Sequence, residues 1–226
     1  LEPLGSRATR PAVSRGPYPS LSCCHAVMTS KAQLRQTLRA RRRALSTQQQ
    51  SIAARGIIKQ LNKLASFRKA RHIACYLEND GELGTQPLRR DCQGRGIACY
   101  LPVVHAEAGH FSMRFHHHRH GQSLRSNRFG IAEPNAWRSP AMPARELDIV
   151  LMPLVGFDRA GRRLGMGGGF YDRALAFIAR RPPPRKRPLL VGVAHSCQEL
   201  EQLPHEPWDV PLDIIVTERE LIRPRR

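Results

Sequence analysis

Residues 148–173, which read DIVLMPLVGFDRAGRRLGMGGGFYDR, constrain the fold more than any other part of the chain. They begin with a continuous apolar run at 149–152, closed by Pro153, of the kind that forms a short strand buried on both faces of a sheet. Four glycines follow within positions 165–169, and residues 170–180 then carry apolar side chains at helical spacing. This order predicts a central strand that leads through a glycine-rich loop into a helix.

The composition of the glycine-rich loop favours an anion, and phosphate above all. Glycine can adopt positive φ and lets the backbone approach a ligand closely, while Arg162 and Arg163 bring cations to the same place. A helix that starts after the loop adds free N–H groups and a dipole that favour negative charge. The P-loop motif is not matched, because no Lys-Ser or Lys-Thr pair follows the glycines, and a dinucleotide fingerprint would need glycine where Phe170 stands. A loop with a purely structural role remains the alternative.

The same stretch resembles the signature of the 5-formyltetrahydrofolate cyclo-ligases, also called methenyltetrahydrofolate synthetases. That signature is an apolar strand, then P-L-V-G/A-F-D and, after a short gap, R-L-G-x-G-x-G-[FY]-Y-D-R. This chain carries the two parts at residues 153–158 and 163–173. Further pieces stand in family order: Lys31 with Arg35, GEL at 81–83, GIAEP at 130–134 and DVPLD at 209–213. The resemblance extends from Lys31 to about Glu220.

The resemblance implies a reaction, a cofactor and a co-substrate. In the family reaction, 5-formyltetrahydrofolate and ATP give 5,10-methenyltetrahydrofolate, ADP and phosphate through a phosphorylated formyl group. The expected ligands are therefore ATP, Mg²⁺ and the folate, which could be polyglutamylated.

The resemblance also implies roles for individual residues. Arg163 and Asp172 are expected to be catalytic, and Asp172 and Asp209 to bind Mg²⁺. Folate contacts are expected from Leu77, Glu82, Met166 and Phe170. ATP contacts are expected from Lys31, Arg35, Arg163, Leu164, Gly165, Met166, Gly167, Gly168, Gly169, Phe170 and Tyr171. Some relatives carry a basic residue where Met166 and Gly168 stand, so charge stabilisation there must come from elsewhere, with Arg162 as the candidate. On the residues alone, the pattern favours an exposed loop acid for Glu82, and capping or surface acids for Asp172 and Asp209.

The remaining pattern predicts a single-domain α/β fold with a mostly parallel central sheet flanked by helices. Strand-like runs stand at 72–77, 97–101, 189–194 and 214–217, and helical patterns start after Ser30 and span 46–65 and 85–94. The order strand, helix, strand between residues 72 and 101 argues for parallel pairing. Glu82 follows the first of these strands, which is where open α/β sheets place ligand contacts.

The chain is strongly basic, which leaves a second function open. Its 37 Lys and Arg against 18 Asp and Glu give a net charge of +19, and such a charge attracts polyanions, so incidental nucleic-acid affinity is expected. The main alternative is a basic RNA-binding protein without ATP chemistry, although no RNP motif or zinc finger pattern supports it. A sugar-phosphate isomerase on a similar sheet is a third alternative and has no motif here.

Cysteine spacing and hydropathy bear on location. The six cysteines show no CxxC spacing, which fits a reducing cytoplasm, and no apolar run of about 18 residues indicates a membrane span. Residues 1–27 lack the apolar core of a signal peptide and are expected to be a disordered extension or an upstream translated segment. Residues 28–226 are expected to form the cyclo-ligase domain, acting as a monomer.

A histidine-rich segment, 105–120, needs its own interpretation. Six histidines suggest a metal site, but adjacent residues of a strand point to opposite faces and cannot converge on one ion. We expect instead a charged edge hairpin with Phe111, Met113 and Phe115 facing inward.

Overall fold

The computed structural model describes residues 30–107, 110–119, 121–127, 130–135, 137, 139–180 and 186–224. The prediction for residues 1–27 falls outside these segments.

A central sheet organises the described segments, with strand order β12-β11-β10-β7-β1-β2-β3-β6. Its strands are β1 (His72–Ala74), β2 (Ala98–Glu107), β3 (His110–His117), β6 (Ala141–Met142), β7 (Ile149–Pro153), β10 (Leu189–Val193), β11 (Ile214–Val216) and β12 (Leu221–Ile222). The five strands from β11 to β2 are parallel to one another, while β12, β3 and β6 are each antiparallel to the inner neighbour. The expected mostly parallel sheet is confirmed.

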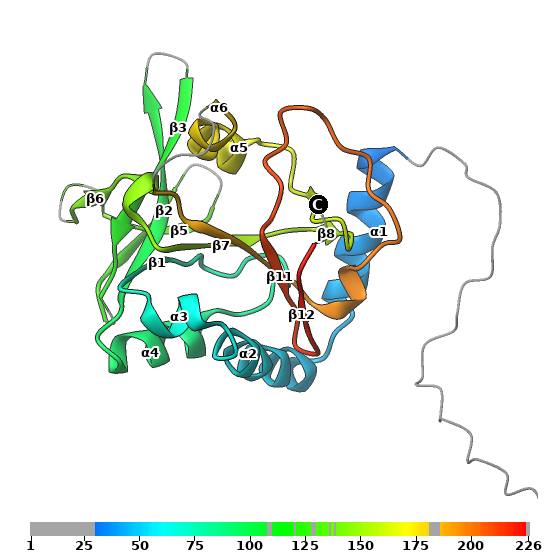
Figure 1. Cartoon of the computed structure of the whole chain (residues 1–226), viewed down its shortest axis with the longest axis horizontal. Coiled ribbons are helices and arrows are strands. Elements are labelled where there is room, and N and C mark those ends of the chain that lie inside the picture. The colour runs from blue at the N-terminus through cyan, green and yellow to red at the C-terminus, as the bar shows by residue number, and fades with distance from the viewer. Residues whose placement is uncertain are drawn as a thin grey trace, which may run out of the picture.

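Helices cover both faces of this sheet. They are α1 (Lys31–Arg43), α2 (Thr47–Leu61), α3 (Ala65–Lys69), α4 (Gln86–Gly94), α5 (Phe170–Leu175) and α6 (Phe177–Arg180). Figure 1 shows α2, α3 and α4 on one face of the sheet, α5 and α6 on the opposite face, and α1 at one end of the molecule. Two small ribbons lie outside the sheet, β4 (Leu124–Ser126) with β5 (Ala132–Pro134), and β8 (Gly156–Phe157) with β9 (Arg163–Leu164).

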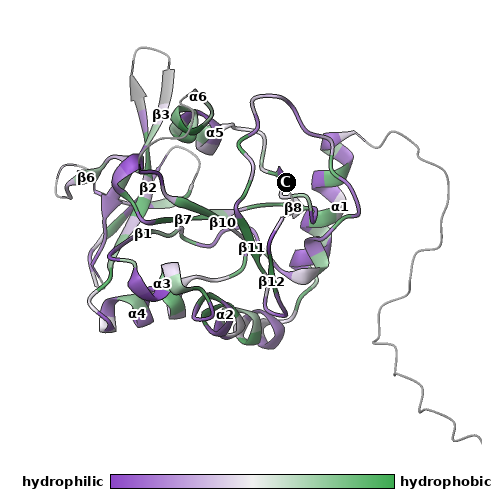
Figure 2. Ribbon diagram, in the orientation of Figure 1, coloured by the Kyte–Doolittle hydropathy of each residue, from purple (hydrophilic) through white to green (hydrophobic). Residues whose placement is uncertain are grey.

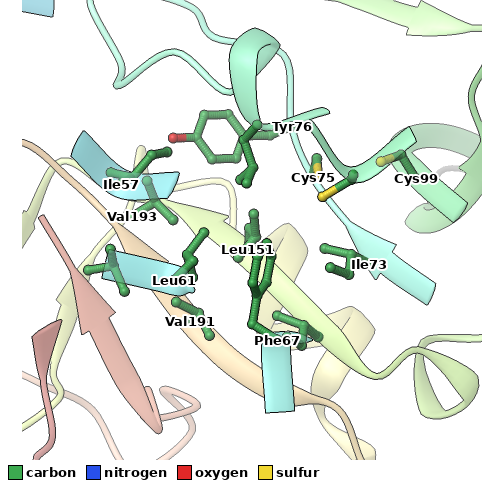
Figure 3. Packing of buried hydrophobic residues seen from close by; sticks show 14 of the residues in the cluster. Ile57, Leu61, Phe67, Ile73, Cys75, Tyr76, Cys99, Leu151, Val191 and Val193 are labelled. Atoms are coloured by element: carbon green, nitrogen blue, oxygen red, sulfur yellow. The ribbon is translucent and has the colours of Figure 1, made fainter. Parts of the chain in front are cut away.

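The strand β7 is buried on both faces, as its continuous apolar sequence predicts. Ile149 and Leu151 belong to the core under α2, α3 and α4, whereas Val150 and Met152 belong to the core under α5. All four side chains are fully buried, and each buried aliphatic side chain of this size contributes about 1.5–3 kcal/mol of transfer free energy. Figure 3 shows Leu151 within the first of these clusters. Figure 2 shows that β10, which pairs with β7, and the next strand, β11, are also hydrophobic.

Two expected helices are divided in the structure. The helix expected at 46–65 begins after Ser46, whose side chain accepts from the backbone N–H of Gln49, but it ends at Leu61. The extended backbone of Leu64 then starts α3, which brings Phe67 into the core with no exposed surface. The pattern at 170–180 likewise forms α5 and α6, separated at Ala176.

The histidine-rich segment is not the edge of the sheet. Strand β3 pairs with β2 on one side and with β6 on the other, so the short β6 is the edge strand. Phe115 faces the core as expected, and Met113 packs against the same cluster. The side chain of Phe111 lies outside the described part of the chain. Within the described segments, no three His, Cys, Asp or Glu side chains gather in a way that could hold a metal ion.

No helix in these segments is long and apolar enough to cross a membrane.

Candidate active site

The fold places a crevice between the carboxyl ends of β1 and β7. The chain leaves β1 through α4 to reach β2 on one side, whereas β7 leads to β10 on the other side. Ligands of open α/β sheets bind where the strand order reverses in this way. The loop that follows β1 and the glycine loop that follows β7 therefore meet at the same edge of the sheet.

A cavity of about 840 Å³ lies there, within the usual size range of small-molecule sites. Its walls contain every residue to which the family resemblance gives a role: Lys31, Arg35, Leu77, Glu82, Arg163, Leu164, Gly165, Met166, Gly167, Gly168, Gly169, Phe170, Tyr171, Asp172 and Asp209. These residues come from α1, the loop after β1, strand β9, the glycine loop with α5, and the segment before β11. The segment around Ile131, to which no role was assigned from the sequence, also contributes to the wall.

The glycine loop is packed against the first half of α1. The guanidinium Nε of Arg35 donates to the carbonyl oxygen of Gly165 at 2.8 Å. Gly167 has a φ of 101°, and a Cβ there would lie 3.6 Å from Cζ of Arg35. The start of the loop is held by the β8–β9 ribbon, which the sequence did not predict because two-residue strands carry no periodicity. Glycine is needed at Gly167 by the backbone conformation, since other residues rarely adopt this φ.

An ion pair stands at the cavity wall between Arg163 and Asp172. Arg163 Nη2 bonds Oδ1 of Asp172, and the backbone N–H of Val210 donates to the same oxygen at 3.1 Å. The Arg163 side chain is only 7% exposed, whereas that of Asp172 is 19% exposed. Both catalytic residues suggested by the resemblance are therefore neighbours, and the segment before β11 is tied to them.

Lys31, at the start of α1, faces two acids. Its Nζ lies 3.1 Å from Oε1 of Glu206 and 3.9 Å from Oδ2 of Asp209. The backbone N–H of Glu206 in turn donates to Asp209 Oδ2 at 2.8 Å, which fixes the turn between the two acids. Trp208, between them, is 69% exposed and lines the cavity. The sequence analysis missed Glu206, since contacts between segments so far apart leave no local signal.

Glu82 lines the cavity at the end away from Lys31, and its side chain is largely buried. Burial raises the pKa of Glu82 to about 7, against the lowering effect of the nearby Arg42 guanidinium. Arg42 Nη1 lies 3.8 Å from Oε1, and the backbone N–H of Asn79 donates to Oε2 at 3.2 Å. Glu82 is thus a cavity acid and not the exposed loop acid that was the alternative.

Near Glu82, the Tyr171 hydroxyl is buried and has no hydrogen-bond partner among the described residues. Burial is the main cause that raises the pKa of Tyr171, so the hydroxyl is neutral and can donate. An unpaired buried hydroxyl on a cavity wall costs free energy unless a ligand satisfies it.

The loop that carries Glu82 is held by Asp80, a residue with no predicted role. Arg39 Nε bonds Asp80 Oδ2 at 2.6 Å, Arg42 Nη2 bonds the same oxygen at 2.9 Å, and Arg43 bonds Oδ1. Burial raises the pKa of Asp80, but the three arginines outweigh it and lower the pKa to about 2. Arg42 is fully buried and also donates to the carbonyls of Asp80 and Leu154. The sequence Asn79-Asp80-Gly81 is typical of a left-handed turn and is the signal that could have drawn attention here.

Arg162, suggested as a source of compensating charge, has another partner. Its Nη1 lies 3.6 Å from Oδ2 of the buried Asp158. Arg173, which lines the cavity with its guanidinium 5.1 Å from the Phe170 ring centroid, is the additional cation at this wall.

Comparisons with known proteins identify the same family as the sequence signature. A family described as the 5-formyltetrahydrofolate cyclo-ligase family matches residues 27–218. The 5-formyltetrahydrofolate cyclo-ligase of Haemophilus influenzae is 39% identical over 187 residues, which are 82% of this chain and 97% of that protein. The protein of the same name from Escherichia coli K12 is 39% identical over 180 residues, or 80% of this chain and 96% of that protein.

The fold is also similar to that of a solved relative. The NMR structure of Aquifex aeolicus 5,10-methenyltetrahydrofolate synthetase matches with a TM-score of 0.72 and 31% identity, covering 87% of this chain and 93% of that one. Since sequence and fold agree along most of the length, the chain belongs to the 5-formyltetrahydrofolate cyclo-ligase family.

Proposed function

We propose that the chain catalyses the ATP-dependent cyclisation of 5-formyltetrahydrofolate to 5,10-methenyltetrahydrofolate, and that residues 28–226 are the catalytic domain. The observation that carries this proposal is one cavity with two chemically different ends. One end has cations, carboxylates and a glycine loop, which suit a triphosphate. The other has Glu82, the apolar side chains of Leu77 and Leu101, and the hydroxyl of Tyr171, a residue that the resemblance assigned to ATP. This end suits a flat heterocycle with polar edges.

The chemistry begins at the formyl oxygen, which is a poor leaving group. That oxygen attacks the γ-phosphorus of ATP, so an O–P bond forms and ADP departs. N10 of the folate then attacks the activated carbon, the C–O bond breaks, phosphate leaves with the former formyl oxygen, and N10 loses its proton. The five-membered ring of the methenyl product is closed by the new C–N bond. Such a reaction needs two reactants held in line and charge neutralised at the phosphate.

The residues at the triphosphate end fit this task. Lys31 and Arg35 would bind the phosphate oxygens, and Arg163 would neutralise charge that develops on the transferred group. The backbone N–H groups of the glycine loop, which can approach closely because they carry no side chain, would bind further oxygens. Asp172 and Asp209 would present carboxylate oxygens, the donors that Mg²⁺ prefers. Both contacts to Asp172 in the structure use Oδ1, so Oδ2 is the oxygen that we assign to the metal.

When bound by the carboxylates of Asp172 and Asp209, Mg²⁺ would neutralise part of the phosphate charge. The protein's own residues orient the reactants: Leu77, Met166 and Phe170 would contact the folate ring system, and Glu82 its polar edge.

The structure does not favour the RNA-binding alternative. Arg39, Arg42 and Arg43 contribute to the basic charge on which that alternative rests, but all three bond Asp80 of the same chain. Arg42 has no exposed surface with which to contact a polyanion, and the Asp80 carboxylate offsets part of the charge of the other two arginines.

The fate of the formyl oxygen tests the proposed intermediate. With a heavy-oxygen label in the formyl group, the proposal predicts labelled inorganic phosphate and one ADP for each methenyl product. Label found in water, with unlabelled phosphate, would contradict phosphorylation of the formyl group.

A further inference from the structure

We infer that Asp80 is a positioning residue for the folate end of the cavity: held by three arginines of α1, it fixes the loop that presents Glu82. This inference rests on the proposed function and goes beyond it, because Asp80 has no role in that chemistry.

The backbone around Asp80 has little freedom to place Glu82 by itself. Asp80 has a φ of 53° and Gly81 a φ of 75°, two consecutive left-handed residues. A Cβ on Gly81 would lie 3.5 Å from the carbonyl oxygen of Arg42, so the loop runs directly against the end of α1. A left-handed aspartate costs about 1 kcal/mol or more, and such a conformation persists only where surrounding contacts hold it.

The contacts that hold it are the three arginine bonds to one carboxylate. Arg39 and Arg42 share Oδ2, while Arg43 bonds Oδ1, so both carboxylate oxygens are used. Arg42 also donates to the backbone carbonyl of Asp80 at 2.8 Å and to that of Leu154 at 3.3 Å. Through this one buried guanidinium, the loop after β1 is joined to the turn after β7.

Asp80 also determines what Arg42 does to Glu82. Arg42 Nη2 bonds Asp80 at 2.9 Å, whereas its Nη1 is 3.8 Å from Glu82, beyond a hydrogen bond. The charge of Asp80 therefore keeps Arg42 from closing on Glu82. Without that charge, Glu82, 3.8 Å away, is the remaining carboxylate that the structure places beside the buried guanidinium. A buried cation without a paired carboxylate is strongly destabilising, so Arg42 would move towards Glu82. Glu82 would then be withdrawn from the folate.

The same helix carries the residues assigned to ATP at its other end. Lys31 and Arg35 lie in the first two turns of α1, and Arg39, Arg42 and Arg43 lie in its last two turns. A change at Asp80 is thus expected to weaken folate binding while leaving the ATP end intact, and this difference separates positioning from general loss of structure.

Asp80→Asn is the decisive variant. Asparagine tolerates the left-handed backbone and has nearly the same shape, so only the charge is removed. We expect the KM for 5-formyltetrahydrofolate to rise at least tenfold, while the KM for ATP changes less than threefold. Arg43→Gln, which removes the most exposed of the three arginines, should raise the folate KM by a smaller factor, and Arg43→Lys should restore most of it.

The control is Asp91→Asn, which removes the α4 carboxylate that lies 3.2 Å from Arg95, the residue after the helix; neither residue lines the cavity. It should leave both KM values unchanged. An unchanged folate KM in Asp80→Asn would overturn the inference. A parallel rise of both KM values with a lower melting temperature would also overturn it, because that result indicates a structural role alone. The comparison uses ratios to the wild-type chain, so absence of wild-type turnover would count against the proposed function and not against Asp80.

Discussion

The carboxylate of Asp172 accepts from Arg163 and from the backbone N–H of Val210 at one and the same oxygen, Oδ1. The pair joins the β8–β9 ribbon, α5 and the segment before β11 at the end of the cavity that we assign to the triphosphate. This sharing leaves the second oxygen for the metal in the proposed mechanism.

Asp172→Asn is expected to reduce turnover by about 10²–10³-fold or more, the range found when a group that stabilises developing charge is removed. The fold should survive, because an amide oxygen can still accept from Val210. Turnover and melting temperature, measured together with Asp91→Asn as the control, check this. Activity within a few fold of wild type would contradict the assignment of Asp172 to Mg²⁺.

Gly167→Ala is expected to damage the loop through its backbone. The φ of 101° is strained for alanine, at a cost of about 1–3 kcal/mol, while the added Cβ would meet Arg35 only at an ordinary contact distance. The KM for ATP should therefore rise and the melting temperature fall. In Gly94→Ala, the matched control, the Cβ meets nothing within 4 Å and the φ is not positive. That variant should be neutral or more stable by up to about 1 kcal/mol. Equal effects of the two substitutions would show that the loop conformation is not what matters.

Glu206→Gln is expected to lower the KM for ATP by about two- to threefold. Glu206 occupies Lys31 at 3.1 Å before any phosphate arrives, and a pair of this exposure is worth less than about 1 kcal/mol. Removing the charge releases the lysine. The exposed Glu146, which lies 3.9 Å from Arg145, provides the control as Glu146→Gln and should change nothing. An increase in the KM for ATP would mean that Glu206 itself supports binding.

Glu82→Gln is expected to change how stability depends on pH. The pKa of Glu82 is raised from 4.5 to about 7, so between these values the unfolded chain ionises while the folded chain stays protonated. The stabilising contribution of the protonated acid is full below pH 4.5 and is lost as pH rises to about 7. The charged groups around Glu82 are Arg42, which lowers its pKa, and Asp80 and Glu78, which raise it. The pKa of about 7 includes these three effects.

The free energy of unfolding of Glu82→Gln, relative to wild type, should therefore increase across this interval, by at most about 3 kcal/mol. Denaturant titrations below and above the interval measure it. A constant difference between the two proteins would show that Glu82 has an ordinary pKa.

The central strand of the sheet could be predicted from the sequence. The run at 149–152 predicted a strand buried on both faces because no polar residue interrupts it, and the structure confirms β7 at the centre of the sheet. Division of the expected helices at Leu64 and Ala176 was not predictable, since helical spacing continues across both positions and packing decides where each helix ends.

The site was predictable only in part. The glycine loop carries its own signal, and the family signature supplied Lys31, Asp172 and Asp209. Asp80 and Arg42 were missed because a row of arginines on a helix gives no sign of which one is buried. Only the folded chain shows that Arg42 has no exposed surface and that Asp80 accepts three arginines.

The most direct test of the whole account is the absorbance of the conjugated methenyl product when the purified chain is mixed with 5-formyltetrahydrofolate and Mg²⁺, with and without ATP. The account predicts a rise that requires ATP and that Asp172→Asn nearly abolishes. A flat trace from folded wild-type protein in the presence of ATP, or an equal rise without ATP, would contradict it.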